Sequence, residues 1–167
     1  MDFNIVLIGM PGSGKSTVGV VLAKKLGFDF LDTDILLSKK EGTPLSDLIV
    51  KHGYEDFLMR ENELGKSVKR DKTVIATGGS MPLCKEAMEN LKQKSVTVYL
   101  KVSLSDLNKR LPKNLSDRGV AAPALYSVED IYNMRRPFYE RYADITIDCN
   151  GNADGVAQQI IDALEKS

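Results

Sequence analysis

Short runs of apolar residues alternate along this chain with longer stretches in which apolar positions recur every three or four residues. The continuous runs are typical of buried strands, whereas the helical spacing is typical of helices with one apolar face. The predicted strands cover residues 4–8, 28–31, 73–77, 96–102 and 145–147. The predicted helices cover residues 18–26, 45–49, 54–68, 128–141 and 156–164, and one more ends near Leu111 after a cap at Ser103 or Ser105.

Capping residues and one aperiodic segment mark the boundaries of these elements. The pair Thr43-Pro44 offers an N-cap and a first-turn proline for the second predicted helix. Ser127 followed by Asp130 has the spacing of a capping box. Residues 112–126 show neither helical nor strand periodicity, which predicts a mobile loop.

The alternation of strands with helices predicts the fold class. It indicates a parallel sheet covered by helices on both faces, a three-layer α/β/α arrangement with five strands. A chain of this length suits one hydrophobic core, so we expect a single domain over residues 1–167. Ligands of such sheets bind beyond the carboxyl ends of the strands. The stretches 9–16, 32–34 and 78–80 each follow a predicted strand and should lie along that edge.

The stretch from Gly9 to Ser16, GMPGSGKS, has the spacing of a P-loop between a predicted strand and a predicted helix. Its glycines let backbone N–H groups turn toward phosphates, and the helix N-terminus adds partial positive charge. Lys15 can bridge the terminal phosphates, and the Ser16 hydroxyl can ligate Mg²⁺. The predicted nucleotide-binding residues are Gly12, Ser13, Gly14, Lys15, Ser16 and Thr17. We therefore expect a nucleoside triphosphate with magnesium at this loop.

Two acidic residues follow the second predicted strand. Asp32 and Asp34 are two positions apart, so on a strand end their side chains would point the same way. In the functional interpretation Asp32 helps to hold Mg²⁺ through water, and Asp34 orients or deprotonates an attacking hydroxyl. A pair of solvated turn aspartates is the alternative.

Two further features complete the predicted site. Gly78 and Gly79 follow a predicted strand, where glycine lets the backbone approach a ligand closely. Arg118 is the single arginine of the segment 112–126 and could close over a transferring phosphoryl group, although a solvated side chain explains it equally well. Lys15, Asp34 and Arg118 are the candidate catalytic residues.

Charge and cysteine content narrow the range of partners. The 23 Lys and Arg residues balance the 23 Asp and Glu residues, so no overall field favours nucleic acid or an anionic membrane. Cys84 and Cys149 lack metal-ligand spacing, which favours reduced thiols in a reducing compartment. No run reaches the roughly 18 apolar residues of a membrane helix, and the acidic Asp2 and short apolar stretch at the N-terminus lead us to expect no signal peptide. We expect a cytoplasmic monomer that acts on a small molecule.

These residues together resemble the shikimate kinase family, whose P-loop fold is similar to that of nucleoside monophosphate kinases. The resemblance rests on GMPGSGKSTVG, LAKKLGFDFLDTD, Gly78-Gly79, TVYLKVS and the segment Arg135-Arg136-Pro137-Phe138-Tyr139. It implies a mobile lid near 112–124 and an acceptor-binding helical region near 34–62. It also implies transfer of the γ-phosphoryl group of ATP to the 3-hydroxyl of shikimate, a step of aromatic amino acid biosynthesis.

The resemblance also assigns roles by position. It implies acceptor contacts from Asp34, Gly78, Gly79 and Arg136. Arg118 would be the arginine of the lid, and Arg110 would lie beside adenine. Lys15, with Ser16 and Asp32 at the magnesium ion, would complete the phosphoryl-transfer machinery.

The chain departs from the family pattern in the helix after Gly53. The family usually has an arginine that grips the acceptor carboxylate at the position where this chain has Leu58. Arg60 is a poor substitute, because two residues on a helix lie about 200° apart around its axis. Glu61, which the pattern pairs with the missing arginine, is present, and it could turn to Arg136 or to a positive group on a different acceptor.

Three functions therefore stay open, in this order. The first is an ATP-dependent kinase that phosphorylates shikimate, and the second is a kinase of the same fold that acts on another hydroxylated metabolite because of Leu58. The third is an ATP-binding regulator without an acceptor. A GTPase switch is disfavoured because the chain lacks an Asn-Lys-x-Asp guanine signature.

Overall fold

The computed structural model describes residues 1–167, apart from the side chain of Ser116. The strands are β1 (Asn4–Ile8), β2 (Asp29–Asp32), β3 (Thr73–Ala76), β4 (Ser95–Lys101) and β5 (Ile145–Asp148). The helices are α1 (Lys15–Leu26), α2 (Thr33–Glu41), α3 (Leu45–Ser67), α4 (Lys85–Leu91), α5 (Leu104–Arg110), α6 (Val128–Tyr142) and α7 (Ala153–Lys166). Two 3₁₀ turns, η1 (Met81–Leu83) and η2 (Leu115–Arg118), complete the elements.

The strands form one parallel sheet in the order β2-β3-β1-β4-β5. The central strand β1 has Ile5 opposite Val74 on one side and Val96 on the other. All five residues of β1 are buried, as expected for a strand with neighbours on both sides and helices on both faces. The predicted α/β class and the five-stranded parallel sheet are confirmed.

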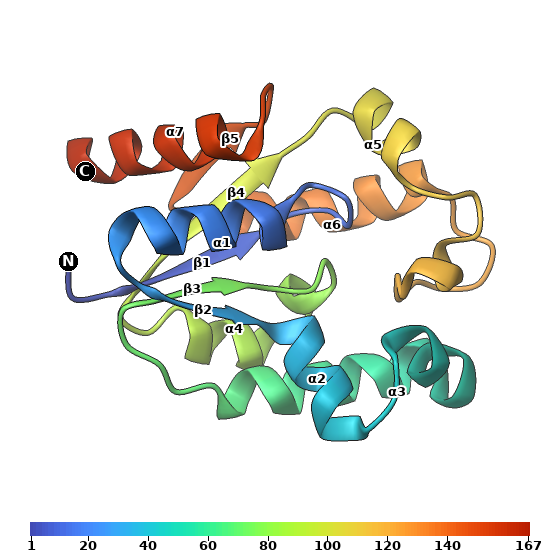
Figure 1. Ribbon diagram of the computed structural model, residues 1–167. Helices are drawn as coiled ribbons and strands as arrows, with labels where there is room; N and C mark the ends of the chain where they lie inside the picture. Colours follow the sequence, from blue (N-terminus) through green and yellow to red (C-terminus); the bar gives the residue numbers. More distant parts are fainter.

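Helices cover both faces of the sheet, and the site lies at its carboxyl edge. Figure 1 shows α1 and α7 together on one face, with α4 and α6 on the other. Beyond the carboxyl ends of the strands, α2 and α3 face the segment that joins α5 to α6. The main hydrophobic core includes residues from β1, β3, β4, α1, α4, α6 and α7, so it spans both faces of the sheet.

Two short helices of the structure were not predicted. One is α2, which the Asp32 side chain caps by accepting hydrogen bonds from the backbone N–H groups of Asp34 and Ile35. The other is α4, which buries Ala87, Met88 and Leu91. Helices of nine and seven residues leave few repeats to read in a sequence, and their stability comes largely from tertiary packing. Because α2 begins at Thr33, Asp34 lies in the first turn of a helix, and its predicted position on a strand end is wrong.

The two helices predicted on either side of Gly53 form one element with a kink. Gly53 has φ 81° and ψ 174°, which is a non-helical conformation inside α3. The missing Cβ makes this backbone conformation accessible to glycine. The kink separates the first part of α3 from the part that carries Phe57, Leu58 and Glu61.

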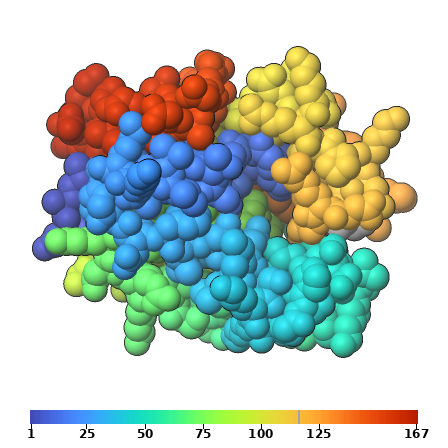
Figure 2. All heavy atoms as spheres, in the orientation of Figure 1, coloured from blue at the N-terminus to red at the C-terminus, as the bar shows by residue number. Residues whose placement is uncertain are grey.

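The aperiodic segment 112–126 lies across α3. It contains η2 and buries Leu115, Val120 and Ala121. Ala121 belongs to a second, smaller apolar cluster together with Leu37, Leu48, Phe57 and Leu64. Figure 2 shows this segment, in orange, directly beside α3 in teal. Contacts of this segment with α2 and α3 thus close one side of the carboxyl edge.

None of the helices in the described part of the chain is long and apolar enough to cross a bilayer.

Candidate active site

A cavity of about 240 Å³ lies at the carboxyl edge of the sheet, and we call it the P-loop cavity. Its lining comes from the P-loop, α1, α2, α3, the β3–η1 connection, the segment 118–121 and α6. The lining residues that carry the chemistry are Lys15, Ser16, Asp34, Ser80, Arg118 and Arg135. Residues that are far apart in the sequence therefore meet at the edge where the sequence predicts a ligand.

The P-loop has the backbone geometry of a phosphate cradle. Gly12 and Gly14 have φ of 79° and 90°, conformations that a residue with a Cβ adopts only with strain. The Lys15 ammonium donates to the carbonyl oxygens of Gly9 and Met10, each at 2.8 Å, and to Ser13 Oγ at 3.3 Å. Burial lowers the pKa of Lys15 to about 8, against the opposing effect of the nearby Asp34 carboxylate. An anionic ligand would favour the charged ammonium.

Ser16 and Asp32 meet at the start of α1, and their shared role at a magnesium ion stays a prediction. Ser16 Oγ donates to Asp32 Oδ2 at 2.5 Å, while Asp32 Oδ1 caps α2. Among the described residues no cluster of three or more His, Cys, Asp or Glu side chains forms a metal site. A hydroxyl beside one carboxylate fits Mg²⁺, which keeps several water ligands and is commonly shared with substrate phosphates.

Asp34 lines the P-loop cavity from the first turn of α2. Burial and the neighbouring Asp32 charge raise the pKa of Asp34 to about 6, while Lys15 and Arg135 act in the opposite direction. Gly78 packs against this carboxylate, since a Cβ at Gly78 would lie 2.5 Å from Asp34 Oδ1. The structure thus places Asp34 beside Lys15 and leaves it deprotonated at neutral pH, which suits a base or an orienting acceptor.

The arginine of α6 that faces the cavity is Arg135, and the predicted acceptor contact from Arg136 is wrong. Arg135 lines the cavity and is 1% exposed, and its guanidinium donates from Nη2 to the Ala121 carbonyl. The Arg136 side chain is 49% exposed and pairs with Glu140 at 3.6 Å. The buried positions of α6 are Ile131, Arg135 and Tyr139, which are four residues apart and share one face. The sequence contains this spacing, but Tyr132 and Arg136 are also four residues apart, so only the packing of α6 identifies Arg135 as the inward arginine.

The partner of Glu61 in the cavity wall is not Arg136, which the sequence offered as one possibility. Ser80 Oγ donates to Glu61 Oε2 at 2.5 Å, and Glu61 is 2% exposed. Arg136 is therefore not its partner. Leu58 packs against the main core and is not among the residues that line the cavity. Arg60 points elsewhere, to Asp56 and Glu41, as its helical position predicts.

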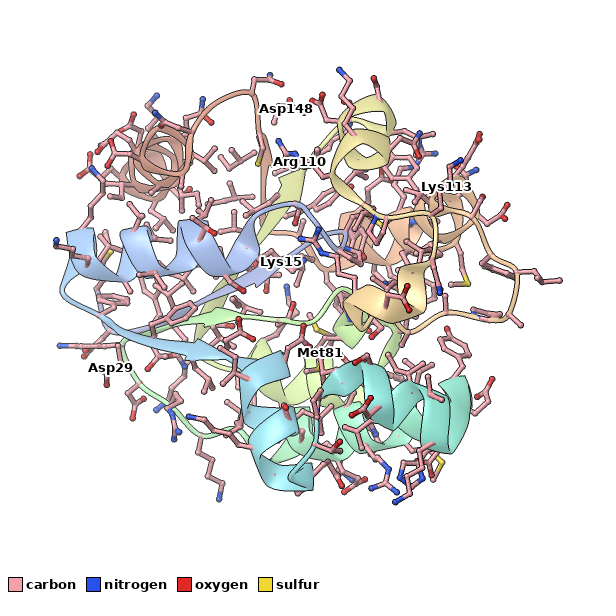
Figure 3. All side chains as sticks on the ribbon, turned by 45° about the vertical axis from the view of Figure 1, so that its right-hand side comes forward. Lys15, Asp29, Met81, Arg110, Lys113 and Asp148 are labelled. Carbon is pink, nitrogen blue, oxygen red and sulfur yellow. The ribbon has the colours of Figure 1, made fainter. Side chains whose placement is uncertain are left out.

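Two arginines connect the segment 112–126 to the P-loop. Arg118 Nη1 donates to the Arg110 carbonyl at 3.0 Å, and Arg110 Nη1 donates to the Gly12 carbonyl at 3.0 Å. Figure 3 shows Arg110 next to the loop between β1 and α1. Arg118 lines the cavity, where the sequence predicts it. Both cations therefore stand close to where phosphates would lie on the P-loop.

Sequence reasoning missed two residues that shape the β3–η1 connection. Ser80 holds Glu61, and Tyr139 donates from its hydroxyl to the Gly79 carbonyl at 2.6 Å. A Cβ at Gly79 would lie 2.7 Å from Pro11, which explains why this turn carries glycine beside the P-loop. No local pattern reports such contacts, since the partners are 19 and 60 residues apart.

The family match and the similar bacterial proteins agree on one family. Residues 11–165 match the family described as Shikimate kinase. A shikimate kinase of Clostridium botulinum strain 657 is 38% identical over 169 residues, which cover 98% of this chain and 96% of that protein. Human threonine synthase-like 1 is 33% identical over 168 residues, but these make up only 23% of that protein.

Solved structures agree in fold. The shikimate kinase from Acinetobacter baumannii in complex with shikimate superposes with a TM-score of 0.85 at 32% identity, covering 98% of this chain and 93% of that one. The shikimate kinase from Aquifex aeolicus has a TM-score of 0.82 at 30% identity, covering 97% and 96%. Both likenesses extend over nearly the full length of each chain.

Proposed function

The chain belongs to the shikimate kinase family, and on that premise we propose that it transfers the γ-phosphoryl group of ATP to the 3-hydroxyl of shikimate. The observation that carries this proposal is the P-loop cavity, because it brings Lys15 together with Asp34 and Arg135. A phosphate-binding lysine, a carboxylate and a buried guanidinium are what a kinase for an anionic alcohol needs.

Each residue has a definite part in the proposed reaction. The P-loop N–H groups and Lys15 hold the phosphates, and Lys15 turns from its own loop carbonyls toward the β- and γ-phosphates. Asp34 accepts a hydrogen bond from the acceptor hydroxyl and takes its proton as the oxygen attacks phosphorus. Arg135 binds the acceptor carboxylate, and Gly78 and Gly79 let the acceptor approach the backbone.

The remaining charges act on the phosphoryl group. Ser16 and Asp32 would hold Mg²⁺, Ser16 directly and Asp32 through water. When bound, the ion neutralises charge on the phosphate oxygens. Arg118, from the segment 112–126, closes over the transferring group. Arg110, whose guanidinium donates to the Gly12 carbonyl, contacts adenine.

A coupled ADP-release assay with ATP and Mg²⁺ tests the proposal. We expect shikimate to stimulate ADP release at sub-millimolar concentration, relative to a reaction without acceptor. The same assay with a panel of hydroxylated metabolites tests the second function, a kinase for a different acceptor, which Leu58 favours because it supplies no cation. Stimulation by another metabolite but not by shikimate would replace the proposed substrate. ATP binding without stimulation by any acceptor would favour a regulator.

A further inference from the structure

Two ionisable side chains beside the P-loop cavity each keep one polar atom without a partner. Glu61 Oε1 and Arg135 Nε are both buried and make no hydrogen bond. Glu61 and Arg135 are 2% and 1% exposed, and they do not form an ion pair with each other. Buried polar atoms are rarely left in this condition, because an unmade hydrogen bond in the protein interior is costly. The two atoms therefore indicate a site that is completed by a ligand.

The Glu61 carboxyl is crowded by a second acid. A Cβ at Gly78 would lie 2.6 Å from Glu61 Oε1 and 2.5 Å from Asp34 Oδ1, so both oxygens converge on one point. The ionisable groups that act on Glu61, or on which it acts, are Asp34 of α2, Lys15 of α1, Arg135 and Tyr139 of α6, Tyr54 of α3 and Cys84 before α4. Only Lys15 and Arg135 among these are cations, and neither forms an ion pair with Glu61.

Position 58, which is next to Glu61 on α3, carries a leucine and so supplies no positive charge to balance the Glu61 carboxylate. Residues three apart on a helix are neighbours, so the side chain at position 58 is adjacent to Glu61 on α3. Burial and the Asp34 charge raise the pKa of Glu61 to about 8, despite the opposing effects of Ser80, Arg135 and Lys15. At neutral pH the carboxyl is thus largely protonated and uncharged.

We propose that Glu61 is a specificity-determining residue whose charge sets the affinity for an anionic acceptor, with Arg135 as the group for which it competes. In its neutral form Glu61 leaves the Arg135 guanidinium to the acceptor carboxylate. In its ionised form it attracts Arg135 and repels that carboxylate. This inference rests on the proposed function, because it requires an acceptor that carries a negative group.

The proposal predicts a pH dependence in acceptor binding rather than in turnover. With ATP and Mg²⁺ saturating, the KM for shikimate should rise about tenfold from pH 7 to pH 9, as expected for one ionisation near pH 8 when only the protonated form binds. The kcat should change much less, since Glu61 does not touch the reacting atoms. An acceptor analogue without the carboxylate should show no such rise in KM.

Glu61→Gln provides the decisive variant, because an amide has the same shape and cannot ionise. We expect its KM for shikimate to change less than about threefold over the same pH range. A larger change would show that groups other than Glu61 cause the pH dependence. Glu63→Gln is the matched control on the same helix, since Glu63 is exposed and pairs with Lys66. It should keep the wild-type pH profile.

Leu58→Arg offers an independent check. An arginine at position 58 would form an ion pair with the ionised Glu61 carboxylate, which would then neither attract Arg135 nor repel the acceptor. The KM should therefore fall, and its rise between pH 7 and pH 9 should disappear. A wild-type KM that is flat with pH, or one that rises in parallel in Glu61→Gln, would overturn the inference and leave the proposed function intact. Absence of any shikimate-dependent ADP release would instead overturn the proposed function, and the inference with it.

A measurement without turnover completes the test. In protein labelled with ¹³C at glutamate carboxyl carbons, the resonance lost in Glu61→Gln should titrate well above the ordinary range of glutamate. Titration below pH 6 would overturn the inference whatever the acceptor proves to be.

Discussion

The hydroxyl of Ser16 lies 2.5 Å from Oδ2 of Asp32, and this contact joins the P-loop to the start of α2. The other oxygen of the same carboxylate caps α2 and so fixes the first turn, which carries Asp34. One aspartate therefore connects the phosphate-binding loop to the position of the proposed base.

Arg135 and Arg136 are adjacent in the sequence but should differ sharply on substitution. Arg135→Met removes a buried guanidinium from the cavity, and loss of a charge-assisted contact of about 1.5–3 kcal/mol predicts a KM for shikimate about 10- to 150-fold higher. Arg136→Met alters an exposed side chain and should stay within about twofold of wild type. Steady-state kinetics on both variants measures the KM for shikimate, and circular dichroism checks that each variant is folded. Equal effects of the two substitutions would refute the assignment to Arg135.

Asp34→Asn should remove the proposed base while keeping its size. We expect kcat to fall by about 10²- to 10⁴-fold, which is the usual contribution of a positioned acid or base, with ATP affinity retained. Asp29→Asn is the matched control, because Asp29 is exposed at the start of β2, at the opposite end of this strand (Figure 3). Retention of more than half of the wild-type kcat by Asp34→Asn would exclude Asp34 as the base.

Gly78→Ala tests the close packing between the β3–η1 connection and the two acids. The added Cβ would lie 2.5 Å from Asp34 Oδ1 and 2.6 Å from Glu61 Oε1, so at least one of the two carboxylates must move. We expect at least a tenfold loss of kcat/KM, because small displacements of catalytic groups can lower rates by about 10²-fold. Gly151→Ala is the control, since nothing lies within 4 Å of a Cβ there. Similar activities of the two variants would contradict the packing described here.

The stability of the protein should depend on the charge of Glu61. Burial and the Asp34 charge raise the pKa of Glu61 in the folded protein to about 8, above its ordinary value of 4.5. Between pH 4.5 and pH 8 the folded state therefore binds more protons than the unfolded state. The contribution of Glu61 to the free energy of unfolding is full below pH 4.5 and is lost as pH rises through 8. Urea unfolding of wild type and Glu61→Gln at pH 5 and pH 8.5 measures this contribution. We expect the stability of Glu61→Gln relative to wild type to be greater at pH 8.5, and no change in that difference with pH would contradict the raised pKa.

The nucleotide half of the site was largely predictable from local sequence. A continuous apolar run, a glycine-rich loop and an amphipathic helix specify β1, the P-loop and α1 through backbone geometry and burial within one stretch of chain. The capping box of Ser127 and Asp130 was confirmed at the start of α6 for the same reason. The acceptor half was less predictable, because α2 is short and its place depends on packing of Leu37 against Leu48 and Phe57.

The sequence by itself determined the five strands, every helix except α2 and α4, the phosphate-binding loop and the edge at which the site forms, because these follow from periodicity and from glycines within short segments. Only the tertiary structure decided that Asp34 belongs to a helix, that Arg135 rather than Arg136 faces the cavity, and that Glu61 is held by Ser80. Those facts depend on the rotation of helices against the sheet and on contacts between residues distant in sequence, which no local pattern encodes.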